Sequence, residues 1–187
     1  MDKLETGMAY RLVLIVAPQG AGKTRLLHQW IQRRSTMGLP APVWISLEEQ
    51  DNDLAQFLQH LVTTCIEIDP HLLNLSQSLR HVEELSEKQV NRPALSMPGE
   101  FNSEDLLIDL INALAGLPRE IALIMDEYHR IESPEVHQTV SFFINYLPEN
   151  VHVYLASRGE PRLRIAHLRA RREIIQIGPA ELFHSYR

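Results

Sequence analysis

The residues best suited to chemistry form one short stretch, Ala17-Pro18-Gln19-Gly20-Ala21-Gly22-Lys23-Thr24. This stretch follows an apolar run at residues 12–16 and precedes a segment with helical periodicity. A glycine-bearing turn between a strand and a helix directs several backbone N–H groups inward, and the positive end of the helix dipole lies beside them. The pattern therefore predicts a phosphate-binding P-loop.

Individual residues of this loop have expected roles. Gly20 and Gly22 lack a Cβ, so the main chain there can curl and come close to a phosphate. Lys23 is expected to reach the β- and γ-phosphates, and the Thr24 hydroxyl is expected to hold Mg²⁺. The pattern begins with Ala17 instead of glycine, which the turn accommodates if its φ is negative. The alternative is a chance match in a loop, which the strand before it and the helix after it disfavour.

Further polar residues end two later apolar runs. Asp126 and Glu127 end one run, and Arg158 lies just beyond another. Because ligands of open α/β sheets bind beyond the carboxyl ends of the strands, we expect these side chains at the P-loop edge. Asp126 would hold Mg²⁺, Glu127 would orient or deprotonate an attacking water, and Arg158 would bind the γ-phosphate. The alternatives are ordinary polar strand ends and, for Arg158, a structural ion pair.

The rest of the chain predicts an α/β fold that would position these residues. Apolar runs predict strands at about 11–17, 43–47, 121–127, 151–156 and 173–177. Helices are expected after Lys23, Asp53, Ser103 and Ser133, and over about 162–172. Strands that alternate with helices imply a parallel sheet with right-handed crossovers. Little structure is expected in residues 1–10, short helices and a loop in 68–102, and a connection after the fifth strand.

Some residue groups could be functional but favour structural interpretations. The acidic cluster of Glu48, Glu49, Asp51 and Asp53 could bind a metal, but its position favours a solvated loop at a helix N-terminus. Cys65 lies on an apolar stripe, so it is expected in the core. His129 lacks metal-type spacing and is expected to be a neutral hydrogen-bonding residue. The arginines of residues 158–172 could bind nucleic acid or a partner domain, but they favour a solvated face.

Size and composition narrow the class of protein. The chain has 187 residues, of which 44% are hydrophobic and 22% charged, so residues 1–187 are expected to form one globular domain. The net charge of −6 argues against a general nucleic-acid binder. With one cysteine, no membrane-length apolar run and no export signal, a cytoplasmic protein without membrane contact is expected.

Taken together, the motifs resemble the NTPase domain of the MalT-like regulators, the large ATP-binding members of the LuxR group within the STAND class of signalling ATPases. Besides residues 11–24, the similarity is carried by Trp44-Ile45-Ser46-Leu47-Glu48, Ile124-Met125-Asp126-Glu127-Tyr128-His129, Phe142-Phe143-Ile144-Asn145-Tyr146-Leu147-Pro148-Glu149-Asn150, Leu155-Ala156-Ser157-Arg158 and Leu168-Arg169-Ala170-Arg171. It extends over nearly the whole chain.

The resemblance implies a P-loop NTPase sandwich of three α/β/α layers, with a parallel five-stranded sheet in the order 5-1-4-3-2. It also implies ATP or ADP with Mg²⁺ as ligands, and a switch that hydrolyses ATP slowly. Family members self-associate, and they sense an inducer and bind DNA through other domains. Neither sensor repeats nor a helix-turn-helix occurs in these 187 residues, and the helical lid and winged-helix domain are also expected to lie outside them.

Alternative functions remain open. The chain could be a stand-alone P-loop ATPase or a kinase-like enzyme, although no phosphoacceptor site is evident. It could also be an interaction module with a vestigial nucleotide site, which the intact Lys23, Thr24, Asp126 and Glu127 disfavour. A GTPase and a transporter ATPase are disfavoured because their Asn-Lys-x-Asp and Leu-Ser-Gly-Gly-Gln signatures are missing.

Overall fold

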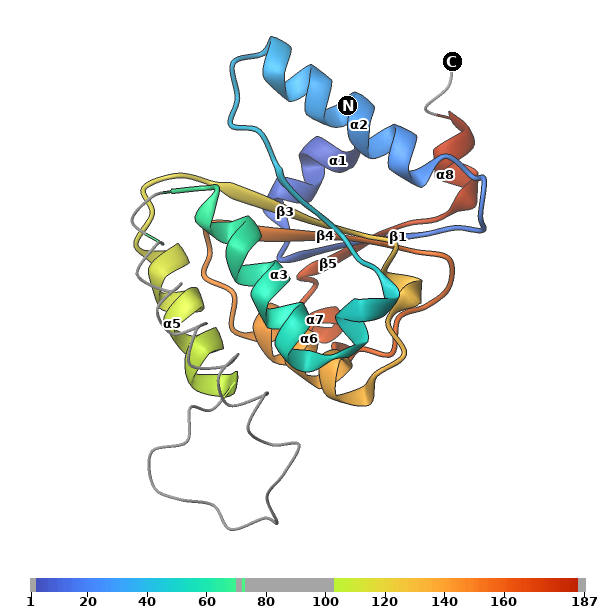
Figure 1. The fold of residues 1–187 in the computed structure, drawn as a ribbon. Helices are drawn as coiled ribbons and strands as arrows, with labels where there is room; N and C mark the ends of the chain where they lie inside the picture. Colours follow the sequence, from blue (N-terminus) through green and yellow to red (C-terminus); the bar gives the residue numbers. More distant parts are fainter. Residues whose placement is uncertain (1–2, 70–71, 73–102, 185–187) are drawn as a thin grey trace, which may run out of the picture.

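The strands form one parallel sheet (Figure 1). The computed structural model describes residues 3–69, 72 and 103–184. The strands are β1 (Leu12–Val16), β2 (Val43–Ser46), β3 (Ile121–Asp126), β4 (Val151–Ser157) and β5 (Ile174–Ile177). They lie in the order β2-β3-β4-β1-β5, and every neighbouring pair is parallel. This confirms the five-stranded sheet and the order that the resemblance implied.

Helices cover both faces of the sheet (Figure 1). One face carries α1 (Lys3–Thr6), α2 (Lys23–Thr36) and α8 (Pro179–His184). The other carries α3 (Leu54–Ile66), α5 (Ser103–Ala115), α6 (Pro134–Asn145) and α7 (Ala166–Ala170). Short 3₁₀ turns are η1 (Gly7–Ala9), η2 (Glu49–Asn52) and η5 (Tyr128–Arg130). The three layers confirm the predicted α/β/α sandwich.

Burial explains why the strands read as unbroken apolar runs. Every residue of β3 and β4 is buried, because side chains that alternate along a strand meet helices on both faces. In β1, Leu12 and Leu14 pack into the core under α3, α5 and α6, whereas Val13 and Ile15 pack into the core under α2. Cys65 is 1% exposed in the first of these cores, as predicted, and burial raises the pKa of its thiol to about 12.

Helix starts follow the capping signals in the sequence. The Asp53 carboxylate accepts from the N–H of Gln56 at 3.0 Å at the start of α3, as expected for an N-cap. Ser133 caps α6, and Pro134 takes the first helical position, where its missing N–H leaves no donor unsatisfied. In the part of the chain that the structure describes, no helix is long and apolar enough to cross a membrane.

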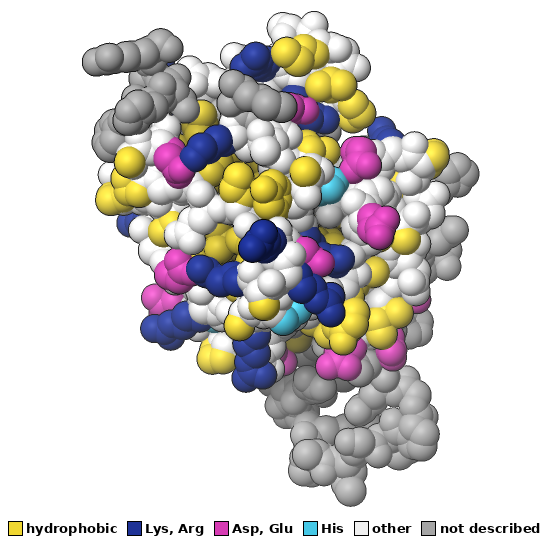
Figure 2. Space-filling model, turned by 180° about the vertical axis from the view of Figure 1, so that it is seen from behind, with side chains coloured by type: hydrophobic (Ala, Val, Ile, Leu, Met, Phe, Trp, Pro, Cys, Tyr) yellow, Lys and Arg dark blue, Asp and Glu magenta, His cyan; other side chains and the backbone are white. Residues whose placement is uncertain are grey.

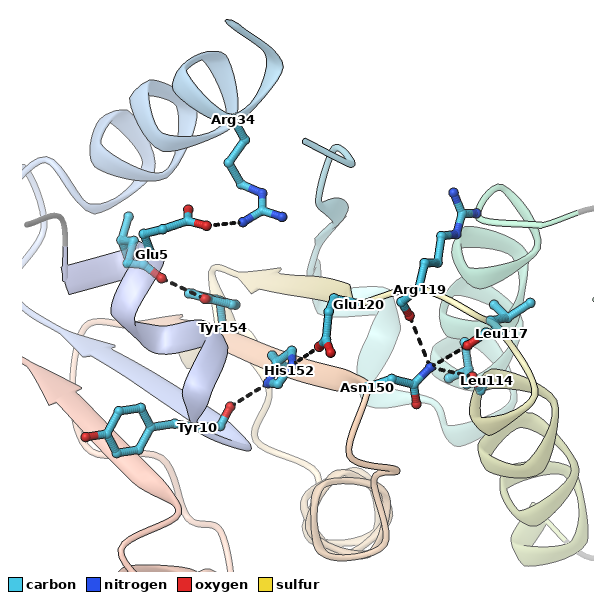
Figure 3. Close-up of polar contacts among 11 residues, drawn as sticks. Glu5, Tyr10, Arg34, Leu114, Leu117, Arg119, Glu120, Asn150, His152 and Tyr154 are labelled. Carbon is cyan, nitrogen blue, oxygen red and sulfur yellow. Dashed lines mark hydrogen bonds and ion pairs between the residues drawn. The ribbon is translucent and has the colours of Figure 1, made fainter. Parts of the chain in front are cut away.

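The N-terminal segment is more structured than the sequence suggested. Leu4 is 1% exposed, and its carbonyl accepts from the Tyr154 hydroxyl at 2.7 Å (Figure 3). The Glu5 carboxylate accepts from the Trp30 indole at 2.8 Å and from Arg34 at 2.6 Å. The prediction of little structure before β1 was wrong because these partners are distant in sequence and a four-residue helix has no periodic signal.

Polar contacts also tie the amino ends of the strands (Figure 3), whereas the P-loop follows the carboxyl end of β1. The His152 ring lies 2.8 Å from the Tyr10 carbonyl through Nδ1 and 2.6 Å from the Glu120 carboxylate through Nε2. The Asn150 amide donates to three carbonyls that end α5 and lead into β3, those of Leu114, Leu117 and Arg119. These contacts join α5 and the N-terminal segment to the sheet.

The helix predicted over 162–172 is shorter than expected. Only Ala166–Ala170 form α7, because the backbone of Arg164 in the preceding segment bonds to side chains of α6 instead of continuing a helix. There the N–H of Arg164 donates to Ser141 Oγ at 3.0 Å, and its carbonyl accepts from Asn145 at 3.4 Å. Arg172, with a φ of 58°, follows the end of α7.

Other expectations are corrected in part. After β5 the chain forms α8, with Leu182 fully buried, where only a connection was expected. In the acidic cluster, Asp51 is 1% exposed instead of solvated, because it accepts from the N–H of Glu48 at 2.7 Å and lies 3.1 Å from His60. Most of the segment predicted as short helices and a loop, residues 70–71 and 73–102, lies outside the described residues.

Candidate functional site

The P-loop connects the end of β1 to the first turn of α2. Gly20 and Gly22 have φ values of 78° and 88°, which only glycine adopts without strain. Glu127 and Arg172 are the only non-glycine residues with positive φ in the described part of the chain, so Ala17 has the negative φ that the turn needs. Pro18, Gln19 and Gly20 are exposed, and Ala21 is partly buried. The outer surface of the loop is therefore accessible.

Lys23 lies against its own loop. Its ammonium group donates to the carbonyl of Ala17 at 2.8 Å and to that of Pro18 at 3.2 Å, and the residue is 6% exposed. Burial lowers the pKa of this amine, and the nearby carboxylates of Glu127 and Asp126 oppose that shift. The positive charge therefore lies in a confined position between the loop and the two candidate acidic residues.

Thr24 and Asp126 meet at the centre of the candidate site. The Thr24 hydroxyl donates to Asp126 Oδ2 at 2.8 Å, which links the start of α2 to the end of β3. Asp126 is 2% exposed, and its other oxygen accepts from the N–H of Glu127 at 2.8 Å. The two residues predicted to hold Mg²⁺ thus lie within hydrogen-bond distance of each other. Hydroxyl and carboxylate oxygens are the hard donors that Mg²⁺ prefers, so this pair fits the ion.

Glu127 has an unusual backbone conformation. Its φ of 58° and ψ of 29° are left-handed, which is uncommon for a residue other than glycine, and strained backbone of this kind clusters at functional sites. Its Oε2 atom lies 3.9 Å from Arg158, 3.6 Å from Arg130 and 3.5 Å from His129. The structure therefore brings Glu127 and Arg158 together, as predicted from the two strand ends.

The His129 ring stays neutral at neutral pH. Burial lowers its pKa most, and the positive charge of Arg158 adds to this effect, although Glu127 opposes it. Its Nε2 atom lies 3.5 Å from Glu127 and its buried Nδ1 atom has no hydrogen-bond partner among the described residues, so the predicted hydrogen-bonding role stays a prediction.

Two contacts that position this part of the site have no signal in the sequence. Asn52 donates to the carbonyl of Arg130 at 2.9 Å and accepts from the N–H groups of Glu132 and Ser133 at 2.6 and 2.8 Å, which fixes the loop after Glu127. The buried Tyr128 hydroxyl lies 2.9 Å from Nδ1 of His137, and this contact joins η5 to α6. Both contacts join residues of separate elements, so no local pattern marks them.

The basic stretch after β4 is interspersed with acidic residues. Arg169 pairs with Glu160, and Arg11 lies 3.2 Å from Glu173. Figure 2 shows dark-blue basic side chains interspersed with magenta acidic ones over one face of the molecule. This mixture is typical of a solvated surface.

Comparisons with known proteins agree with this architecture. No protein-family model matches the chain. The HTH-type transcriptional regulator MalT of Klebsiella pneumoniae subsp. pneumoniae is 32% identical over 182 residues, which cover 97% of this chain and 18% of that protein. The regulator of the same name from Cronobacter sakazakii is 29% identical over the same length. The chain thus spans about a fifth of the length of these relatives. The similarity confirms the resemblance to an NTPase domain of the MalT-like regulators.

One solved structure shows the same fold. The crystal structure of Cdc6p from Pyrobaculum aerophilum matches with a TM-score of 0.50 and 11% sequence identity, over 88% of this chain and 38% of that one. At this identity, the likeness shows the fold alone.

Proposed function

We propose that this chain, a relative of one segment of the MalT regulators, is a nucleotide-binding switch domain that binds ATP and ADP with Mg²⁺ and hydrolyses ATP slowly. The observation that carries the proposal is the 2.8 Å hydrogen bond between Thr24 and Asp126. It joins the start of α2, directly after the P-loop, to the end of β3, which Glu127 follows. The hydroxyl and the carboxylate would bind the metal ion, and the glycine turn beside them would bind the phosphates.

Phosphate binding is assigned to the loop itself. The N–H groups of residues 19–24 would be directed to the phosphates, since Pro18 has no N–H and that of Ala17 donates to the Ser157 carbonyl, and α2 would add the positive end of its dipole. Lys23 would exchange its bonds to the carbonyls of Ala17 and Pro18 for bonds to phosphate oxygens. Because that ammonium is already confined beside the loop, little of its freedom remains to be lost on binding.

Thr24 and Asp126 would hold Mg²⁺, which neutralises phosphate charge when bound. Glu127 would orient or deprotonate a water, since its carboxylate is held near the strand end by a fixed backbone turn. Arg158, whose side chain is 42% exposed, would bind the γ-phosphate. Its present neighbour is Glu127, so nucleotide binding would change which group Arg158 faces.

The regulatory role is proposed from the relatives. They are named as transcriptional regulators, and this chain covers 18% of their length, so sensing and DNA binding would belong to other segments. We propose that residues 1–187 act as one nucleotide-dependent unit that reports its state to such segments. Self-association and an inducer response would belong to that larger assembly.

The test is calorimetric titration with ATP, ADP and GTP in the presence of Mg²⁺. We expect micromolar or weaker binding of adenine nucleotides, and a loss of about 10- to 100-fold in Lys23→Ala, because charge-assisted hydrogen bonds are worth about 1.5–3 kcal/mol. Lys3→Ala is the matched control, since Lys3 is exposed and pairs with Glu181 far from the loop in sequence. Equal affinities for the wild type and Lys23→Ala would reject the P-loop assignment. Rapid steady-state hydrolysis would instead favour a stand-alone ATPase.

A further inference from the structure

A separate cleft lies between α6 and the segment that leads from β4 to α7. Its volume is about 200 Å³, and it is lined by Glu132, Pro134, His137, Gln138, Ser141, Arg162 and Arg164. None of the residues assigned to nucleotide or metal lines it. Pockets for drug-sized ligands usually measure about 300–1,000 Å³, so this cleft suits a small ligand or a single side chain.

The charge of the cleft wall favours an anion. Arg162 and Arg164 supply two guanidinium groups against the single carboxylate of Glu132. Within the described part of the chain, neither guanidinium has a hydrogen bond or an ion pair. Both are exposed, whereas the backbone of Arg164 is fixed to α6 through Ser141 and Asn145. The cleft therefore presents positive charge from an anchored segment, on a chain whose net charge is −6.

A buried histidine supplies a polar group at the base of the cleft. His137 is 7% exposed, and its Nδ1 atom lies 2.9 Å from the interior hydroxyl of Tyr128. Its Nε2 atom, on the opposite side of the ring, has no partner among the described residues, and the residue lines the cleft. Burial and the nearby Arg162 lower the pKa of this ring, which stays neutral. When the hydroxyl of Tyr128 donates to Nδ1, Nε2 carries the hydrogen and can donate into the cleft.

We propose that this cleft is a binding site for a carboxylate group, which pairs with Arg162 and Arg164 and accepts a hydrogen bond from Nε2 of His137. The planar fork of an arginine matches a carboxylate, and the excess of positive charge on the wall attracts an anionic group. The site is independent of the P-loop proposal, because its test needs no nucleotide.

The test follows the histidine side-chain nitrogens by ¹H–¹⁵N NMR in the nucleotide-free protein at pH 7.5. Sodium succinate is the probe, sodium chloride at matched ionic strength is the control, and inorganic phosphate is a competing anion. We expect a saturable shift of His137 Nε2 with succinate, weakened at least about tenfold in the double variant Arg162→Gln and Arg164→Gln. Arg171→Gln, which removes another exposed arginine, should bind as the wild type does.

Glu132→Gln gives a second test that does not depend on the arginine variants, and it should bind succinate more tightly because it removes the opposing carboxylate. A short peptide with one glutamate, blocked at both ends, distinguishes a polypeptide source of the carboxylate from a free metabolite, according to which of the two binds more tightly. Several results would overturn the proposal: no saturable shift with either probe, an unchanged affinity in the double arginine variant, or tighter binding of phosphate than of succinate.

Discussion

Glu127 holds a left-handed backbone conformation that its residue type disfavours, and this can be tested by the change Glu127→Gly. An L-residue in this conformation costs about 1–2 kcal/mol, which glycine would recover. Glycine also gives the unfolded chain more freedom, which subtracts about 0.4–1 kcal/mol. The backbone change alone should therefore stabilise the fold by about 0.5–1 kcal/mol.

Two further variants separate the backbone effect from the loss of the carboxylate. Glu127→Gln keeps the backbone but removes the charge, whose cationic neighbours Arg130 and Arg158 lie 3.6 and 3.9 Å away and so contribute little. Arg172→Gly makes the same backbone change at the other left-handed position, which is exposed and follows α7. We expect Glu127→Gly to be more stable than Glu127→Gln, and Arg172→Gly to be more stable than the wild type, by similar amounts.

The assay is urea denaturation, with the midpoint and the slope both fitted, together with ATP turnover. A gain of about 1 kcal/mol would raise Tm by about 2–4 °C in a chain of this size. Both Glu127 variants should lose turnover and keep nucleotide binding, whereas Arg172→Gly should keep both. A Glu127→Gly protein that is less stable than Glu127→Gln, while Arg172→Gly is stabilised, would refute backbone strain at Glu127. Unchanged turnover in Glu127→Gln would remove Glu127 from the proposed mechanism.

Three more expectations concern the metal, the N-terminal segment and pH. In calorimetry, Asp126→Asn should bind Mg·ATP about tenfold more weakly than the wild type, and it should bind ATP in EDTA equally well. An equal loss of affinity with and without Mg²⁺ would contradict a metal role for Asp126. Glu5→Ala should lower the free energy of unfolding by about 1–3 kcal/mol, since it leaves the buried Arg34 without its carboxylate, whereas the exposed Glu160→Ala should change it by less than about 1 kcal/mol. Folding lowers the pKa of His137, so the unfolded state binds more protons than the folded state just below pH 6.5. The free energy of unfolding should therefore fall as the pH drops through that value. Urea titrations should show a weaker pH dependence in His137→Gln, and a pH dependence equal to that of the wild type would contradict this expectation.

The sequence predicted the sheet and the contents of its functional edge because both depend on local signals. Apolar runs mark strands that are buried on both faces, and Gly20 and Gly22 mark the turn where φ is positive. Parallel topology then requires the ends of β1, β3 and β4 to meet, so Asp126 and Arg158 could be placed at this edge before the structure was known.

The rest depended on contacts between distant residues. The N-terminal segment is ordered by Tyr154 and Trp30, which no local pattern connects to Leu4 and Glu5. Glutamate is not a residue type that marks a left-handed turn, so the backbone conformation of Glu127 could not be inferred from the sequence. In this turn the N–H of Glu127 donates to the Asp126 carboxylate. The cleft between α6 and the segment that leads from β4 to α7 (the α6 cleft) also assembles from two separate segments, so its lining could not be inferred from the spacing of residues in the sequence.

The central claim is that the P-loop edge binds a nucleotide with its metal between Thr24 and Asp126. The most direct measurement is backbone amide NMR of the full chain, titrated with Mg·ADP and then with Mn²⁺ in place of Mg²⁺. We expect the largest shifts in residues 17–24, and the strongest paramagnetic broadening at Thr24 and Asp126, with little effect at the amino ends of β3 and β4. Shifts centred on the α6 cleft, or broadening that spares Asp126, would contradict the account.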